Sequence, residues 1–207
     1  MGYADPDQKG TGLRQRIYSR AFIVGSIDTL ENRWVYVIAD LACGDTAIRN
    51  GVLKRLKAMY GGLYRPGNVA IVGTHSHSGP GTSTRFVLLH ESSIANANEE
   101  ILGAWLNYLL PQITSLGFDQ QSYNAIVDGI VLSIKRAHDS TTPGYLSLSK
   151  GMIEGANVNR SPYAYEANPA AERDQYELIG GEVDKVMTAL TFKKKDGTPL
   201  GYLSFLR

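Results

Sequence analysis

The stretch that decides the fold is Arg33-Trp34-Val35-Tyr36-Val37-Ile38-Ala39-Asp40, an almost continuous run of aromatic and β-branched residues. Such a run predicts a buried strand. Asp45 or Thr46 then supplies a helix cap. Residues 68–73 read as a third, short and apolar strand. Apolar residues recur at helical spacing after the cap, and the pair Gly61-Gly62 ends this pattern. They are Ile48, Val52, Leu53, Leu56 and Tyr60. Strand, helix and strand in this order predict a βαβ unit with parallel strands.

The rest of the chain extends this unit into an α/β fold with a mixed sheet and flanking helices. Residues 20–24 predict a strand before the unit. Residues 120–139 carry an apolar stripe with helical period and precede the breaker Pro143-Gly144, which predicts a helix. Residues 153–169 lack periodicity and predict a long ordered or functional loop. A hairpin turn is predicted at Lys195-Asp196-Gly197-Thr198. Further strands are predicted over residues 145–149, 186–192 and 200–205.

The composition is that of an ordinary folded domain. Of 207 residues, 43% are hydrophobic and 20% are charged, and the formal net charge is +1. This balance gives no electrostatic reason to expect a nucleic acid or an anionic membrane as the main partner. Cys43 is the only cysteine, so an intramolecular disulfide is excluded. The polar start at residues 1–6 lacks the apolar core of a signal peptide, and no apolar run approaches the roughly 20 residues of a membrane helix. Taken literally, the sequence predicts a soluble intracellular chain.

The stretch with the clearest chemistry is Gly73-Thr74-His75-Ser76-His77-Ser78-Gly79-Pro80-Gly81. It directly follows the strand at residues 68–73, and ligands of open α/β sheets gather beyond the carboxyl ends of strands. In extended geometry, His75 and His77 present both imidazoles on one face. Two neighbouring imidazoles suit zinc, with nearby hydroxyl groups orienting them. The alternative is two loop histidines beside a turn.

A catalytic zinc takes three protein ligands, so further candidates matter. The chain has four histidines, the other two being His90 and His138. His138 falls in the last turn of the predicted helix, where a solvated role near the carbonyl end is expected. Asp40 ends a strand of the same sheet. It is a candidate third ligand, a candidate orienting partner for a histidine, or a cap near the helix.

A second polar stretch, Asn157-Val158-Asn159-Arg160-Ser161-Pro162-Tyr163, lies in the predicted loop. Arg160 has the charge and the donors to hold a carbonyl group or an anion, and Pro162 would fix its position. A surface turn is the alternative interpretation.

With these motifs, the sequence resembles the neutral (alkaline-type) ceramidase family. The resemblance extends over most of the chain. It is carried by blocks in the family's order at residues 1–6, 19–24, 73–81, 115–118, 129–138, 159–162, 168–169 and 172–173. It implies hydrolysis of the amide of ceramide to a sphingoid base and a free fatty acid by a zinc enzyme. His75 matches the first zinc ligand, His77 a histidine that faces the substrate, and Arg160 an active-site arginine. The lipid substrate implies an apolar cleft or access from a membrane surface.

Three departures from the family pattern shape the expected domain organisation. The family's secretory leader and first strand are absent before Met1, although its members are secreted or membrane-associated. Residues 82–103 interrupt family-like sequence and are predicted to be an insertion that projects from the sheet. After residue 207, the family continues with a second zinc histidine, a glutamate, a tyrosine and an immunoglobulin-like domain.

Residues 1–207 are therefore expected to be an incomplete fragment, the N-terminal part of a larger zinc-hydrolase domain. In that domain, His75 and His77 should lie near Arg160. Two alternatives stay open: a truncated, catalytically inactive product, or a different metal-dependent hydrolase that uses His75, His77 and Asp40.

Overall fold

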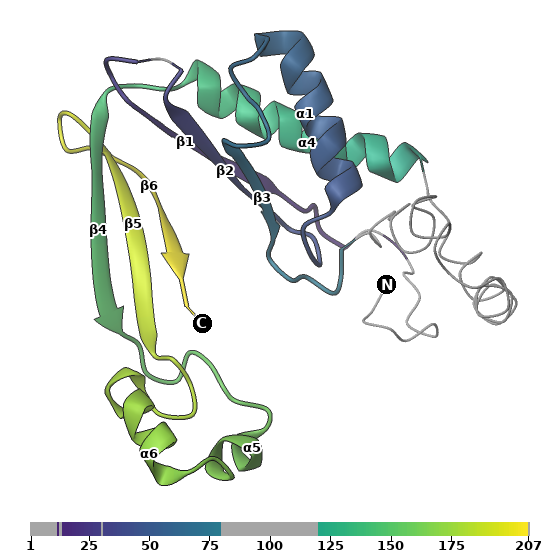
Figure 1. Cartoon of the computed structure of the whole chain (residues 1–207). Coiled ribbons are helices and arrows are strands. Elements are labelled where there is room, and N and C mark those ends of the chain that lie inside the picture. Colours follow the sequence, from purple (N-terminus) through teal and green to yellow (C-terminus); the bar gives the residue numbers. More distant parts are fainter. Residues whose placement is uncertain (1–11, 13, 30, 80–119, 207) are drawn as a thin grey trace, which may run out of the picture. The chain divides into compact units, whose positions relative to one another are not determined.

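The computed structural model describes residues 12, 14–29, 31–79 and 120–206, which fall into two units, residues 1–141 and 142–207 (Figure 1). The first unit is built on a three-stranded sheet in the order β1-β2-β3. Its strands are β1 (Ser19–Gly25), β2 (Arg33–Ala39) and β3 (Val69–Gly73). β1 runs antiparallel to β2, and β3 runs parallel to it. This is the predicted βαβ unit with an antiparallel strand added at one edge.

Helix α1 (Thr46–Tyr60) connects the parallel strands, and α4 (Gln120–Asp139) packs beside it (Figure 1). The pleat of β2 places alternate side chains on the helix side, where Val35 and Val37 are fully buried. They form one hydrophobic cluster with the buried stripes of both helices, which are Ile48, Val52, Leu56, Val127, Ile130 and Ile134. The apolar periodicity of the sequence therefore identified the core of this unit.

The ends of α1 follow the expected capping chemistry. The Asp45 side chain accepts hydrogen bonds from the backbone N–H groups of Ala47 and Ile48, at 2.7 and 3.0 Å. At the other end, Gly61 has a positive φ of 62°, which glycine adopts without steric cost, and its N–H donates to the Lys57 carbonyl. The helix thus begins and ends where its cap residues predict.

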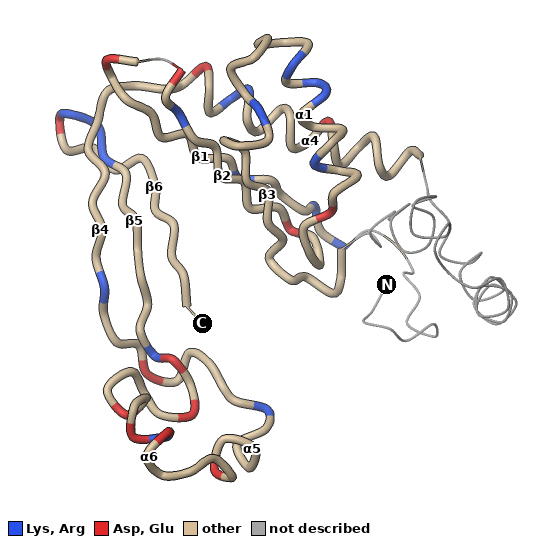
Figure 2. Tube along the Cα trace, viewed as in Figure 1, with Lys and Arg blue, Asp and Glu red and all other residues tan. Residues whose placement is uncertain are grey.

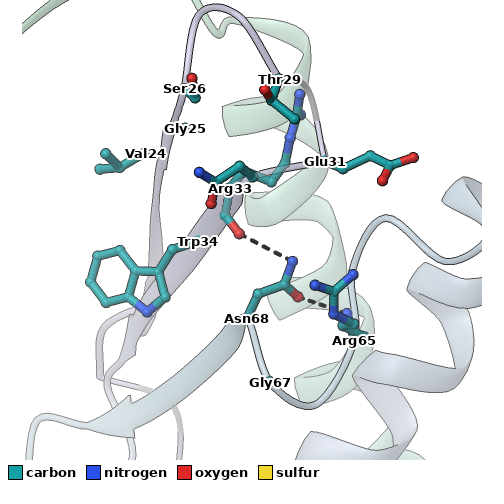
Figure 3. A pocket seen from close by; sticks show the side chains of 11 residues that line it. Val24, Gly25, Ser26, Thr29, Glu31, Arg33, Trp34, Arg65, Gly67 and Asn68 are labelled. Carbon is teal, nitrogen blue, oxygen red and sulfur yellow. Dashed lines mark hydrogen bonds between the residues drawn. The ribbon is translucent and has the colours of Figure 1, made fainter.

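Asn68, predicted to open β3, instead holds together the backbone at the start of that strand (Figure 3). Its amide nitrogen donates to the carbonyl oxygens of Arg33 and Leu63 at 3.1 and 2.9 Å, and its oxygen accepts from the Arg65 N–H at 2.8 Å. The residue is only 8% exposed, so water cannot easily replace these bonds.

We expect Asn68→Ala to lower the free energy of unfolding by about 2–3 kcal/mol, because it leaves three backbone groups short of partners. Urea unfolding followed by circular dichroism measures the change. Asn50→Ala, on the exposed side of α1, is the matched control and should change stability by less than about 0.5 kcal/mol. Equal effects of the two substitutions would contradict this role for Asn68.

The second unit is an antiparallel sheet in the order β4-β5-β6. Its strands are β4 (Gly144–Met152), β5 (Val186–Lys194) and β6 (Pro199–Phe205). Asp196 accepts a hydrogen bond from the Thr198 N–H at 2.8 Å in the turn between β5 and β6, and bonds from Thr198 lower the pKa of Asp196. The hairpin is therefore as predicted. The strands form two sheets, one mixed and one antiparallel, where a single mixed sheet was expected.

The segment between β4 and β5 is more ordered than a loop. It contains α5 (Pro162–Glu166), α6 (Ala170–Arg173) and a 3-10 helix (Asp174–Ile179). Acidic residues gather around these helices (Figure 2), with seven Asp or Glu and two Arg among residues 154–184. Pro162 begins α5, a position where proline's missing N–H costs nothing. Residues 153–169 were predicted to be a long ordered or functional loop, and the lack of periodicity did not indicate the short helix α5 within them.

Within the part of the chain that the structure describes, no helix is long and apolar enough to cross a membrane. The predicted insertion at residues 82–103 lies outside the described residues, and so does His90.

Candidate active site

The loop that carries the two histidines is fastened to the end of the neighbouring strand. Beyond β3, the Thr74 N–H donates to the Ala39 carbonyl at 2.9 Å, and the Ser76 N–H donates to the Leu41 carbonyl at 3.2 Å. The loop therefore continues the pairing of β2 with β3 past the last ladder residue. As predicted, both histidines lie at the carboxyl end of β3.

Glycines at both ends of the loop permit this close packing. A Cβ on Gly73 would lie 2.6 Å from the Leu41 carbonyl oxygen and 2.9 Å from the Cys43 backbone. A Cβ on Gly79 would lie 3.1 Å from the Asp40 carbonyl oxygen. Only glycine fits at position 73 without a shift of the backbone, because the segment that follows β2 comes too close there for a side chain.

His75 has an unusual backbone conformation and a fixed imidazole. Its φ of 63° lies in the left-handed region, which non-glycine residues rarely adopt and which costs roughly 1–3 kcal/mol when it persists at a functional site. Its Nδ1 lies 2.9 Å from the Ala42 carbonyl oxygen. Because a carbonyl oxygen only accepts, Nδ1 carries the hydrogen, and in the neutral ring the lone pair is on Nε2. Histidines that bind metals through Nε2 are oriented in this way.

The ring of His77 lies beside that of His75. Their centroids are 4.7 Å apart with an interplanar angle of 74°, and both residues are exposed. The predicted pairing of the imidazoles is therefore confirmed, but its predicted cause was wrong. The left-handed turn at His75 brings the rings together, whereas the prediction relied on an extended backbone.

Asp40 is engaged in holding the chain before β1. One carboxylate oxygen accepts from the Arg20 guanidinium at 3.0 Å and the other from the Tyr18 N–H at 2.9 Å. Among the described residues, no group of three or more His, Cys, Asp or Glu side chains is arranged to hold a metal. The alternative site made of His75, His77 and Asp40 is therefore not formed.

His138 has a structural role, in contrast to the solvated role expected from its place in α4. Its Nδ1 is 2.6 Å from the hydroxyl of Tyr64, which is 2% exposed, and its ring lies 4.5 Å from that of Tyr60. Burial is the main cause of the raised pKa of Tyr60, and Asp139 adds to it. The three rings connect the C-terminal ends of α1 and α4.

Arg160 lies in the second unit, exposed, just before α5. Its neighbours fix the backbone. Asn159 accepts from the Ser161 N–H at 2.8 Å, and the Asn157 amide donates to the Asp184 carbonyl at 2.9 Å. The segment around Arg160 is thus anchored on both sides. The expected nearness of Arg160 to His75 stays a prediction.

A hollow formed by described residues of the first unit lies away from these histidines. It encloses about 650 Å³ at the end of the sheet where β2 and β3 begin, and its wall includes Trp34, Arg33 and Arg65 (Figure 3). The histidine loop lies beyond the opposite ends of the same strands. Size alone therefore does not locate the site, and the chemistry of the histidine loop does.

Comparison with known proteins decides the family. The family described as neutral/alkaline non-lysosomal ceramidase, N-terminal, matches residues 1–101 and 98–207. The chain belongs to this ceramidase family. It is 41% identical over 192 residues to neutral ceramidase 3 of Arabidopsis thaliana, covering 93% of this chain and 22% of that protein. To the neutral ceramidase of Drosophila melanogaster it is 38% identical over 201 residues, covering 97% of this chain and 25% of that protein.

The fold agrees with a solved ceramidase. The crystal structure of neutral ceramidase from Pseudomonas aeruginosa matches with a TM-score of 0.77 at 34% identity, over 100% of this chain and 28% of that one. The predicted α/β class is thereby confirmed. The chain spans about a quarter of the length of the curated ceramidases it matches.

The sequence did not reveal the group that orients His75, the carbonyl of Ala42. A backbone carbonyl has no residue signature. An indirect signal was available in the glycines of the motif, because a glycine such as Gly73 permits another backbone segment to approach closely.

Proposed function

We propose that this chain contributes to hydrolysis of the N-acyl amide of ceramide, giving a sphingoid base and a free fatty acid, with His75 as a zinc ligand. The observation that carries the proposal is the hydrogen bond from His75 Nδ1 to the Ala42 carbonyl. It holds the imidazole in the tautomer that leaves the Nε2 lone pair for a metal, on a loop at the carboxyl end of a parallel strand. Family membership supports the reaction class.

The residues present fit part of a zinc site. His75 meets the requirements of one ligand, and a catalytic zinc takes three. The proposal therefore includes further ligands from outside the described residues. When bound, zinc would lower the pKa of a water molecule and so supply a nucleophile near neutral pH.

His77 and Arg160 are proposed to act on the substrate. The tetrahedral transition state of amide hydrolysis develops negative charge on the former carbonyl oxygen, and positioned N–H donors stabilise it. The exposed imidazole of His77 lies beside His75, and it would donate such a bond or orient the amide. The guanidinium of Arg160 would add a permanent positive charge with several donors.

The lipid nature of ceramide adds two further parts to the proposal. A substrate with two hydrocarbon chains is extracted from a bilayer, so the enzyme works at a membrane surface. We accordingly propose a secreted or membrane-associated location, as the family resemblance implies.

A chimera tests the proposed function. Residues 1–207 would replace the matching quarter of the Drosophila melanogaster neutral ceramidase, which is aligned over 97% of this chain. We expect zinc-dependent release of fatty acid from ceramide, abolished by chelation and restored by added zinc. The unmodified Drosophila protein is the positive control. A chimera that unfolds at the same temperature as that control, yet releases no fatty acid, would contradict the proposal.

A further inference from the structure

The segment that leaves β2, residues 39–42, supports the histidine loop through its backbone. Its first and third carbonyl oxygens accept hydrogen bonds from N–H groups of the loop, and the carbonyl of Ala42 accepts from Nδ1 of His75. The Asp40 carbonyl also approaches the loop, since a Cβ on Gly79 would lie 3.1 Å from its oxygen. The orientation of His75 therefore depends on how firmly this segment is held.

Asp40 attaches this segment to the start of β1 with directed bonds. The ladder of β1 and β2 ends at the pair of Ser19 and Ala39, and Tyr18 and Asp40 come next. In a hydrogen-bonded antiparallel pair, two residues exchange both N–H···O bonds. Here the Asp40 N–H donates to the Tyr18 carbonyl at 2.9 Å, but the Tyr18 N–H donates to Asp40 Oδ2, also at 2.9 Å. The carboxylate thus takes the place of the Asp40 carbonyl, which approaches the histidine loop.

Arg20 holds the other oxygen of the same carboxylate. Its guanidinium donates to Asp40 Oδ1 at 3.0 Å, and its central carbon lies 5.3 Å from the centroid of the Tyr18 ring. Both carboxylate oxygens of Asp40 are therefore engaged with the chain at the start of β1. A carboxylate is required for this pair of bonds, because an amide of the same size has one acceptor oxygen and would turn a second donor toward Arg20.

We infer that Asp40 is a positioning residue for the hydrolysis of ceramide, an inference that rests on the proposed function. Its carboxylate replaces its own carbonyl in the pairing with Tyr18, so the carbonyl groups of residues 39–42 stay directed at the histidine loop. The last of these carbonyls keeps the hydrogen of His75 on Nδ1 and leaves the Nε2 lone pair for the metal. In this role Asp40 acts through the backbone and contacts neither zinc nor substrate.

Two substitutions at Asp40 grade the expected effect. Asp40→Asn keeps one acceptor oxygen for the Tyr18 N–H but loses the charge that pairs with Arg20, whereas Asp40→Ala removes both acceptors. Asp28→Asn and Asp28→Ala are the matched controls, because Asp28 is an exposed aspartate beyond the opposite ends of β1 and β2. Circular dichroism establishes that each variant is folded, and Asp40→Asn carries the test if Asp40→Ala does not fold.

The tautomer of His75 in the 207-residue chain tests the inference without zinc or turnover. Imidazole ¹⁵N shifts at about pH 8, where an ordinary histidine is neutral, distinguish a hydrogen on Nδ1 from one on Nε2. We expect Nδ1–H to prevail in the parent and in both Asp28 variants. Asp40→Ala should show a substantial population with Nε2–H, and Asp40→Asn a smaller one. A role confined to stability would lower the unfolding temperature and leave the tautomer unchanged, and that result in both Asp40 variants would overturn the inference.

The chimera with the Drosophila melanogaster ceramidase separates this inference from the proposed function. Asp40→Ala should raise the Kd for zinc roughly tenfold, as loss of a group that orients a ligand does, and should lower kcat at limiting zinc without changing KM for ceramide. Excess zinc should restore most of the lost turnover, and a loss that excess zinc leaves in place would count against a positioning role. A chimera that is inactive with Asp40 intact would contradict the proposed function. A changed tautomer in the isolated chain would even then uphold the positioning of His75 by Asp40.

Discussion

His75→Ala in the chimera is expected to lower kcat/KM for ceramide by at least about a thousandfold. Zinc contributes several kcal/mol of transition-state stabilisation to hydrolysis, and each 1.4 kcal/mol is a factor of ten in rate. The hydrogen bond to the Ala42 carbonyl orients the imidazole, so alanine removes the proposed zinc ligand in its oriented position. Release of fatty acid by purified, zinc-supplemented protein measures the loss, and metal analysis measures the accompanying fall in bound zinc.

A matched control separates loss of a ligand from loss of structure. His138→Ala removes a histidine that contacts Tyr64 and Tyr60 at the far ends of the helices, so it should lower stability while leaving bound zinc unchanged. His75→Ala should do the reverse, lowering bound zinc with a smaller effect on stability, because His75 is exposed and lies outside the hydrophobic cluster. Full zinc content in His75→Ala would contradict the assignment of this residue as a ligand.

Local patterns predicted the elements of the fold well, and the pairing of distant strands less well. The bounds of α4 match the prediction because its stripe is continuous and Pro143-Gly144 stops it. β2 was predictable from its aromatic and β-branched run. The alternation of side chains along β4 does not indicate which strand it pairs with. Its place in a separate sheet depends on its pairing with β5, more than 30 residues away in the sequence.

The candidate site was predictable in its side chains and unpredictable in its backbone. The spacing of His75 and His77 predicted neighbouring rings, yet the left-handed φ at His75 has no propensity signal. The partners of Asp40 and His138 come from residues 20 and 74 positions away in sequence, which no periodicity encodes. Both residues consequently appeared available for other roles until their partners were seen.

Residues 1–207 expressed alone are expected to release fatty acid from ceramide at least about a thousandfold more slowly than the chimera. A catalytic zinc needs three protein ligands in fixed geometry, and the described residues offer no such group. If His77 were recruited as a second ligand, it would leave the substrate-facing role proposed for it. Zinc per chain after dialysis, measured beside turnover, is expected to be well below one.

In that experiment, a low activity caused by self-association of the isolated chain must be distinguished from a low activity caused by missing zinc ligands. β6 lies at the edge of its sheet and exposes Leu200 and Tyr202, at 52% and 69%, and such an edge can pair with a second chain. Turnover is therefore measured on the monomer fraction from size exclusion. Robust hydrolysis by that fraction, abolished by chelation and by His75→Ala, would show that these residues complete a metal site by themselves. The ligands beyond His75 would then have to be sought within the 207 residues.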